Sequence, residues 1–247
     1  MNLPERQNFL EISNLNPGEA LANLPSLEEV LGNQTNLAHS KSLETFNDSL
    51  AEVDQWKERL HTSRSQGVGF AAPGGFFTRS LYEAILLKTI PGSEIIPHLK
   101  GRPMIELGAG MYHYGWMIAS ACFASAYIGV EPFYADKLAI SVQAAEEKYT
   151  GTYPIPKSTI LPQDMKQALE NLPDGSANII ACGIEDCIMP DKHYRQIVEN
   201  HILRILPPDG LFISFQTDLH PKGLHLSQSR IKRLDSPHHD NLCLYRK

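Results

Sequence analysis

A carboxylate and two glycines stand together where a short apolar segment ends. Glu106, Gly108 and Gly110 follow residues 103–105, and a helix is expected from about Tyr114. Glycine lets the chain turn tightly and lets a ligand approach the backbone, and a helix that starts after the turn points its positive end at that ligand. A strand, a glycine turn and a helix in this order favour a nucleotide site, which a lone Gly-x-Gly would not distinguish from an ordinary turn.

The residues next to the turn indicate the charge of the ligand. A dinucleotide site has a third glycine three positions after the second, because that glycine allows the helix to pack closely on the strand, and pyrophosphate sits on the helix end. Here that position is His113, and the next glycine is Gly115. Glu106 is expected to point a negative charge into the mouth of the pocket, which disfavours pyrophosphate and favours an ammonium or sulfonium group. S-adenosylmethionine carries both groups, and its only anion is one carboxylate.

Apolar segments that alternate with helical ones must position these residues. Strands and helices in alternation predict parallel βαβ units in a doubly wound sheet, which binds ligands beyond the carboxyl ends of its strands. Two weaker strands near 224–227 and 242–245 are too close together for a crossover helix, so they predict a hairpin that inserts an antiparallel strand. The stronger strands are expected within 103–107, 126–132, 155–164, 177–186 and 210–218, and the later helices over 134–150, 165–172 and 191–206.

The first 80 residues differ in composition from the rest. Apolar residues three or four apart near 24–31 and 43–60 predict amphipathic helices. Residues 67–80 are rich in glycine and aromatics and are expected to interrupt regular structure, before a helix over 81–89. The sequence therefore predicts a helical N-terminal extension over residues 1–80, which could also act as a lid, and a sheet domain over 81–247.

Composition limits the partners. The chain has 247 residues, 42% hydrophobic and 20% charged, and a net charge of −6, whereas nucleic-acid binding surfaces are normally basic. No apolar stretch approaches the roughly 18 residues of a membrane-spanning helix, and the N-terminus lacks the pattern of a secretory signal. We therefore expect a cytoplasmic protein that binds neither nucleic acid nor membrane.

Cysteines and histidines give no metal pattern. Cys122, Cys182 and Cys243 each lie in an apolar run and are expected to be buried, and no Cys-x-x-Cys pair exists. Free thiols of this kind fit a reducing compartment. The histidines of the tail lack helical ligand spacing, so no metal site is predicted; they are His220, His225, His238 and His239.

Four features, in order, resemble the class I, Rossmann-like S-adenosylmethionine-dependent methyltransferases, over the chain from Arg102 on. The first is the E-x-G-x-G segment 106–110, and the second is Glu131, about 20 residues beyond it. The third is Asp164 with the turn at 172–175, and the fourth is the strand at 177–186 with the helix and strand after it. The resemblance implies a mostly parallel seven-stranded sheet, S-adenosyl-L-methionine as cofactor, and methyl transfer.

The resemblance also implies roles for single residues. Glu106 would hold the ligand's amino group, Glu131 would accept from the ribose hydroxyls, and Asp164 would accept from the adenine amino group. Tyr112 stands where the family often has a third glycine and would narrow the pocket near the methionine part. The remaining implied binding residues are Gly108, Ala109, Gly110, Pro132, Phe133, Met165, Gly183 and Arg79.

Four of these residues also have a structural interpretation. Glu131 could be a solvent-exposed strand end, and Asp164 could cap the helix that starts at Met165, a favoured use of aspartate. Phe133 could be a core aromatic. Arg79 could be a surface residue beside two core phenylalanines instead of a partner for the ligand's carboxylate.

Candidates for catalysis are few. Methyl transfer is an in-line displacement that depends mainly on positioning and on exclusion of water, and a base is needed only when the nucleophile must lose a proton. Glu185 or Asp186 after the fourth strand could serve, or His113, whose ordinary pKa suits neutral pH. The pair Glu185 and Asp186 could equally be a solvated helix start.

The methyl acceptor is expected to be oxygen or nitrogen of a small molecule. Within the family that the chain resembles, enzymes that act on DNA bases would show an N-P-P-Y or D-P-P-Y segment after the fourth strand, or a Pro-Cys nucleophile. The chain has none of these motifs. A protein side chain stays open as acceptor. Two other classes also stay open: a binding protein that kept the nucleotide site and lost turnover, and an NAD-dependent oxidoreductase.

Overall fold

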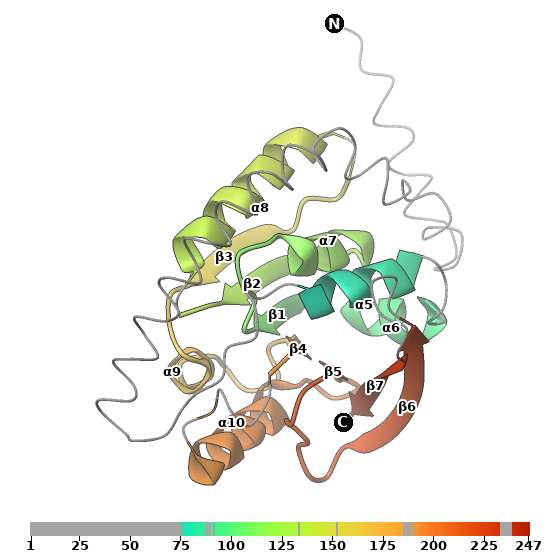
Figure 1. Cartoon of the computed structure of the whole chain (residues 1–247), viewed down its shortest axis with the longest axis vertical. Helices are drawn as coiled ribbons and strands as arrows, with labels where there is room; N and C mark the ends of the chain where they lie inside the picture. Colours follow the sequence, from blue (N-terminus) through green and yellow to red (C-terminus); the bar gives the residue numbers. More distant parts are fainter. Residues whose placement is uncertain are drawn as a thin grey trace, which may run out of the picture.

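The computed structural model describes residues 76–86, 90, 92–132, 134–151, 153–184, 189, 191–232 and 239–247. They form a seven-stranded sheet in the order β3-β2-β1-β4-β5-β7-β6 (Figure 1). The first five strands are parallel, and β7 runs antiparallel to both β5 and β6, which confirms the predicted α/β sheet with an inserted antiparallel strand. The strands are β1 (Pro103–Leu107), β2 (Ala126–Val130), β3 (Lys157–Leu161), β4 (Asn178–Cys182), β5 (Leu211–Phe215), β6 (His225–Lys232) and β7 (His239–Arg246).

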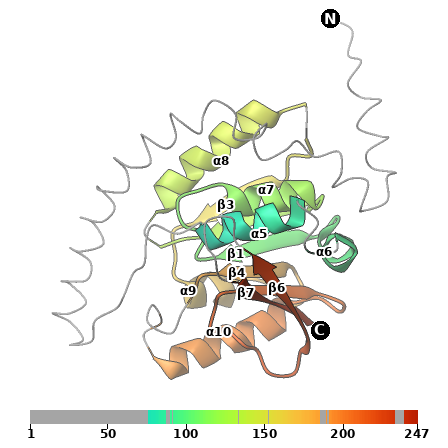
Figure 2. The same ribbon diagram turned by 45° about the vertical axis from the view of Figure 1, so that its right-hand side comes forward.

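Helices cover both faces of the sheet. Figures 1 and 2 show α5, α7 and α8 on one face and α9 and α10 on the other. The strand order runs outward from β1 in both directions, so the order reverses between β1 and β4, where doubly wound sheets bind their ligands. The helices are α5 (Phe76–Leu86), α6 (Gly92–Leu99), α7 (Tyr114–Ala121), α8 (Ala135–Tyr149), α9 (Met165–Glu170) and α10 (Lys192–Ile205).

Side chains of β1 alternate between two buried clusters. Met104 packs in the cluster formed with α5, α6, α7 and α8, whereas Ile105 and Leu107 pack in the cluster formed with α9 and α10. Strands β4 and β5 are buried at every position, as expected of parallel strands covered on both faces. Because side chains alternate along a strand, Glu106 points to the same face as Met104, beneath α5 and α7.

Two helices near the start of the described chain differ from the prediction. The expected interruption over 67–80 is wrong in its last residues, because α5 begins at Phe76 and crosses the predicted boundary between residues 80 and 81. Its most deeply buried residues, Thr78, Leu81, Tyr82 and Ile85, follow helical spacing, which the preceding glycines and aromatics obscured. The helices predicted near 24–31 and 43–60 lie outside the described residues.

Helix α6 was not predicted, because its sequence contains Pro97. Proline lacks an N–H and is unfavourable inside a helix. Here the helix is stabilised by burial, since Ile95, Ile96 and Leu99 are at most 1% exposed.

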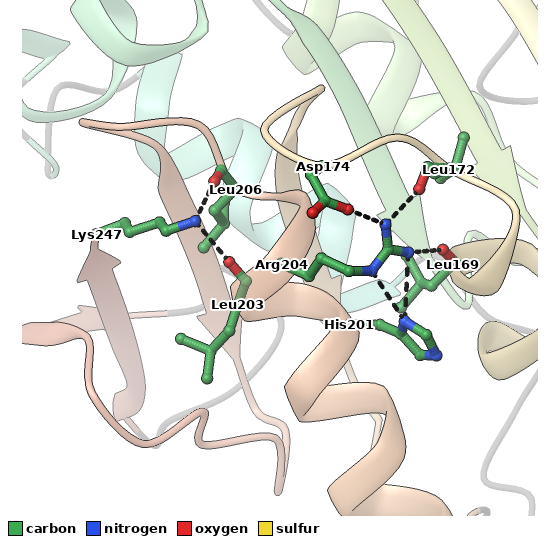
Figure 3. Close-up of polar contacts among 8 residues, drawn as sticks. All are labelled: Leu169, Leu172, Asp174, His201, Leu203, Arg204, Leu206 and Lys247. Atoms are coloured by element: carbon green, nitrogen blue, oxygen red, sulfur yellow. Dashed lines mark hydrogen bonds and ion pairs between the residues drawn. The ribbon is translucent and has the colours of Figure 1, made fainter.

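Polar contacts fix the C-terminal half of α10 (Figure 3). Arg204 donates from Nη2 to the carbonyl of Leu169 at 2.8 Å and from Nη1 to the carbonyl of Leu172 at 2.7 Å and to Asp174 at 2.6 Å. Lys247 donates to the carbonyls of Leu203 and Leu206 near the helix end, at 2.9 and 2.8 Å. The helix is therefore tied both to the turn that precedes β4 and to the end of β7.

The expected burial of three cysteines is confirmed. Cys122, Cys182 and Cys243 are buried free thiols, whereas Cys187 lies outside the described residues. Within the described part of the chain, no helix is long and apolar enough to cross a membrane. The same residues include no group of three or more side chains that could hold a metal ion.

Candidate ligand-binding site

The carboxyl ends of the parallel strands lie level at one edge of the sheet. Leu107 pairs with both Val130 and Ala181, and Val130 also pairs with Leu161. The residues that follow these strands therefore come together, although they are far apart in sequence. They are the turn at Gly108, Ala109 and Gly110, then Glu131, Asp164 and Gly183.

The glycine turn after β1 is tied to the end of β2. Gly108 and Gly110 have φ of +62° and +69°, a left-handed conformation that favours glycine. The N–H of Ala109 donates to the carbonyl of Val130 at 3.1 Å, and the N–H of Gly110 donates to Glu131 Oε2 at 2.8 Å. The acid that ends β2 thus fixes the shape of the turn.

Glu131 is a buried carboxylate beside the glycine turn. Its side chain is 5% exposed, so the interpretation as a solvent-exposed strand end is wrong. Besides the Gly110 N–H, it accepts from the N–H of Tyr134 at 3.3 Å through Oε1. The neighbouring Pro132 is exposed, and Phe133 lies outside the described residues.

Glu106 does not point into the mouth of a pocket, contrary to the expectation. Its side chain is 0% exposed, and its two oxygens accept from Thr78 Oγ1 at 2.8 Å and from the Tyr127 hydroxyl at 2.6 Å. Burial outweighs these two hydrogen bonds and raises the pKa of the carboxyl to about 7. At neutral pH the group is therefore partly uncharged, and its contact with a ligand's amino group stays a prediction.

Asp164 caps the N-terminus of α9, which is the structural role considered for it. Its Oδ1 accepts from the N–H of Gln167 at 3.1 Å, which caps α9, and from the hydroxyl of Tyr194 at 3.0 Å. Oδ2 has no hydrogen-bond partner among the residues that the structure describes. Capping leaves one oxygen for a donor such as the adenine amino group. Met165 follows, and it is buried.

Gly183 lies under the first turn of α5. Its φ is +69°, and a Cβ built on it would stand 2.5 Å from Phe77 Cδ2. The N–H of Gly183 donates to the carbonyl of Phe215 at 2.9 Å. Arg79, two residues after Phe77, is partly buried. The predicted roles of Gly183 and Arg79 in binding a ligand stay predictions.

His113 is the one predicted catalytic candidate within the described residues. Its Nδ1 lies 2.7 Å from Ser141 Oγ. Burial, with a smaller effect of the Lys148 charge, lowers the pKa of the imidazole to about 4, which makes it a weak base at neutral pH. Glu185 and Asp186 lie outside the described residues.

The three residues that surround the carboxylate of Glu106 were not identified as its neighbours from the sequence. Thr78, Gly115 and Tyr127 enclose the Glu106 carboxylate. The alternation of side chains along β1 is the signal that could have found this arrangement, because it assigns Glu106 to the covered face of the sheet.

The chain is similar to solved structures at low sequence identity. No protein-family model and no curated protein matches the chain. Among solved structures it is similar to the N-methyltransferase NodS from Bradyrhizobium japonicum WM9, at 10% identity over 69% of this chain and 96% of that chain, with a TM-score of 0.47. It is also similar to SMU.1697c from Streptococcus mutans, solved in complex with SAH, at 10% identity over 63% and 94% of the two chains and a TM-score of 0.44. The chain is similar as well to TrmN from Thermus thermophilus, at 14% identity over 66% of this chain and 48% of that chain, with a TM-score of 0.45.

Proposed function

We propose that this chain is an S-adenosylmethionine-dependent methyltransferase that acts on oxygen or nitrogen of a small molecule. The observation that carries the proposal is the glycine turn at the point where the strand order reverses. Its second glycine donates to the carboxylate that ends β2. This arrangement leaves bare backbone and an acceptor-rich carboxylate together at the ligand edge of a doubly wound sheet.

The residues present fit a nucleoside ligand. Gly108 and Gly110 lack side chains where the backbone must be approached, Glu131 places a carboxylate, the group that would accept from ribose hydroxyls, beside the turn, and Asp164 Oδ2 can accept from an adenine amino group. When bound, S-adenosylmethionine supplies a methyl group already activated by a sulfonium. The work left to the protein is to orient the acceptor and to exclude water.

The acceptor and the base are proposed from the sequence. A net charge of −6 disfavours nucleic acid, and cysteines of the kind found here fit a reducing cytoplasm. Glu185 or Asp186 is proposed as the base where a proton must be removed, because the pKa of His113 is too low for that task.

One observation favours a second candidate, an NAD-dependent oxidoreductase. A buried Glu106 that is partly uncharged at pH 7 no longer opposes a pyrophosphate group. The position of a third glycine is still occupied by His113, so this candidate ranks second.

Calorimetric titration separates the candidates. Saturable binding of S-adenosylhomocysteine with no heat from NAD supports the proposal, and the reverse result overturns it. Incubation with methyl-labelled S-adenosylmethionine and a metabolite extract then tests turnover. Cofactor binding without any labelled product would identify a binding protein instead of an enzyme.

A further inference from the structure

The first turn of α5 spans the point where the strand order reverses. Thr78 donates to Glu106 on β1, and Phe77 lies against Gly183, the residue after β4. The ring of Phe77 also meets that of Phe215 on β5 edge to face, with centroids 6.0 Å apart. Two successive residues of one helix thus contact three adjacent strands near their carboxyl ends.

The hydrogen bond from Thr78 is buried on both sides. Thr78 is 2% exposed and Glu106 is 0% exposed. Tyr127 occupies the second oxygen of the carboxylate, and a Cβ on Gly115 would stand 1.8 Å from that oxygen. Both oxygens of the carboxylate are therefore engaged, and a movement of α5 away from β1 would leave a buried acceptor unsatisfied, which is costly.

Glu106 is also continuous with the glycine turn, because only Leu107 separates it from Gly108. A shift of the Glu106 backbone would displace a turn whose shape depends on the Gly110 bond to Glu131. We propose that Thr78 is a positioning residue of the ligand site: through Glu106 it holds the first turn of α5 and the glycine turn at a fixed separation. The inference rests on the proposed nucleoside-binding function of the turn.

Substitution of Thr78 tests the inference. Thr78→Val keeps the shape and removes the donor, whereas Thr78→Ser keeps the donor. Ile85→Val is a matched control, since it removes one buried methylene from the same helix and keeps the hydrogen bond between Thr78 and Glu106. We expect Thr78→Val to weaken binding of S-adenosylhomocysteine about tenfold, as for one buried acceptor left unpaired, and the other two variants to stay within about twofold.

The pH profile distinguishes positioning from general stability. The groups that act on Glu106 are Thr78 on α5, Tyr127 on β2, Glu131 after β2, and Cys182 on β4. The hydrogen bond from Thr78 lowers the pKa of Glu106. Thr78→Val should therefore move the pH dependence of ligand affinity to higher pH, whereas Thr78→Ser and Ile85→Val should leave it in place.

The possible results distinguish the role of Thr78 from the proposed function of the chain. Equal affinity and equal pH profile for Thr78→Val and the wild type would overturn the inference while leaving the proposed function intact. An equal loss in Ile85→Val would show that Thr78 acts only through the stability of α5. If the wild type binds NAD and not S-adenosylhomocysteine, the proposed function fails, and the same variants are tested with NAD. A wild type that binds neither would overturn both.

Discussion

Gly115, in the first turn of α7, lies directly against the carboxylate of Glu106. A Cβ at this position would stand 1.8 Å from Oε2 and 2.4 Å from Cδ of the glutamate. The glycine that follows the turn in sequence therefore makes room for a buried acid. Its role concerns the support of the turn, not direct contact with a phosphate.

Gly115→Ala should destabilise the protein, although alanine inside a helix is normally better than glycine by about 1 kcal/mol. The Cβ would force the carboxylate away from Tyr127 and Thr78, and we expect a loss of about 2–4 kcal/mol in the free energy of unfolding, as for other broken buried networks. Chemical denaturation measures it.

The double variant provides the control for this substitution. Glu106→Ala removes the carboxylate, so adding Gly115→Ala to it should cost little or should stabilise. The two changes should therefore be strongly non-additive. Additive losses would mean that Gly115 is required for some reason other than the space taken by Glu106.

Glu106→Gln should flatten part of the dependence of stability on pH. The pKa of Glu106 is raised from 4.5 to about 7 in the folded protein. The folded state then holds a proton that the unfolded state loses, so stability falls as pH rises from about 4.5 to 7 and does not recover above it. The free energy of unfolding falls by about 3 kcal/mol over this range. The Glu106→Gln variant lacks this fall.

Denaturation of both proteins at pH 5 and pH 8 measures this effect. The advantage of Glu106→Gln over the wild type should be larger at pH 8 than at pH 5. His113 has a lowered pKa and acts in the opposite sense, losing stability as pH falls below about 6.5. It is the same in both proteins, so it cancels from the difference. A difference that does not change with pH would show that Glu106 titrates normally.

Glu131→Ala should weaken binding of S-adenosylhomocysteine by about 1–3 kcal/mol, as expected for loss of a buried charged hydrogen bond. Part of the loss would come through the turn, because the N–H of Gly110 loses its acceptor. Calorimetry measures the dissociation constant. Asp136→Ala removes an exposed acid from the first turn of α8 and should bind normally. An unchanged constant for Glu131→Ala would show that the ribose is held elsewhere.

Arg204→Ala should cost about 2–3 kcal/mol of stability, because the carbonyls of Leu169 and Leu172 lose a charged donor. Asp174→Ala should cost less than about 1 kcal/mol, since that carboxylate is 77% exposed and exposed ion pairs contribute little. Urea denaturation compares the two. Similar losses would mean that the ion pair, and not the carbonyl bonds, stabilises α10.

The alternation of strands and helices was sufficient to predict the sheet, including the hairpin that inserts β7 between β5 and β6. Local patterns could also place Glu131 and Asp164 after their strands. They could not reveal that Thr78 is the partner of Glu106, because Thr78 comes from a helix that composition had hidden. Proline concealed α6 in the same way: tertiary burial of Ile95 and Leu99 outweighed a local preference.

The docking of α5 has a consequence for the order in which the protein matures. This helix is synthesised before every strand, yet its first turn contacts Phe215 on β5. With 11 residues, it is too short to persist by itself in water. During translation the contact between Phe77 and Phe215 cannot form until β5 has left the ribosome, so the first turn of α5 should gain its full protection from hydrogen exchange only late in folding.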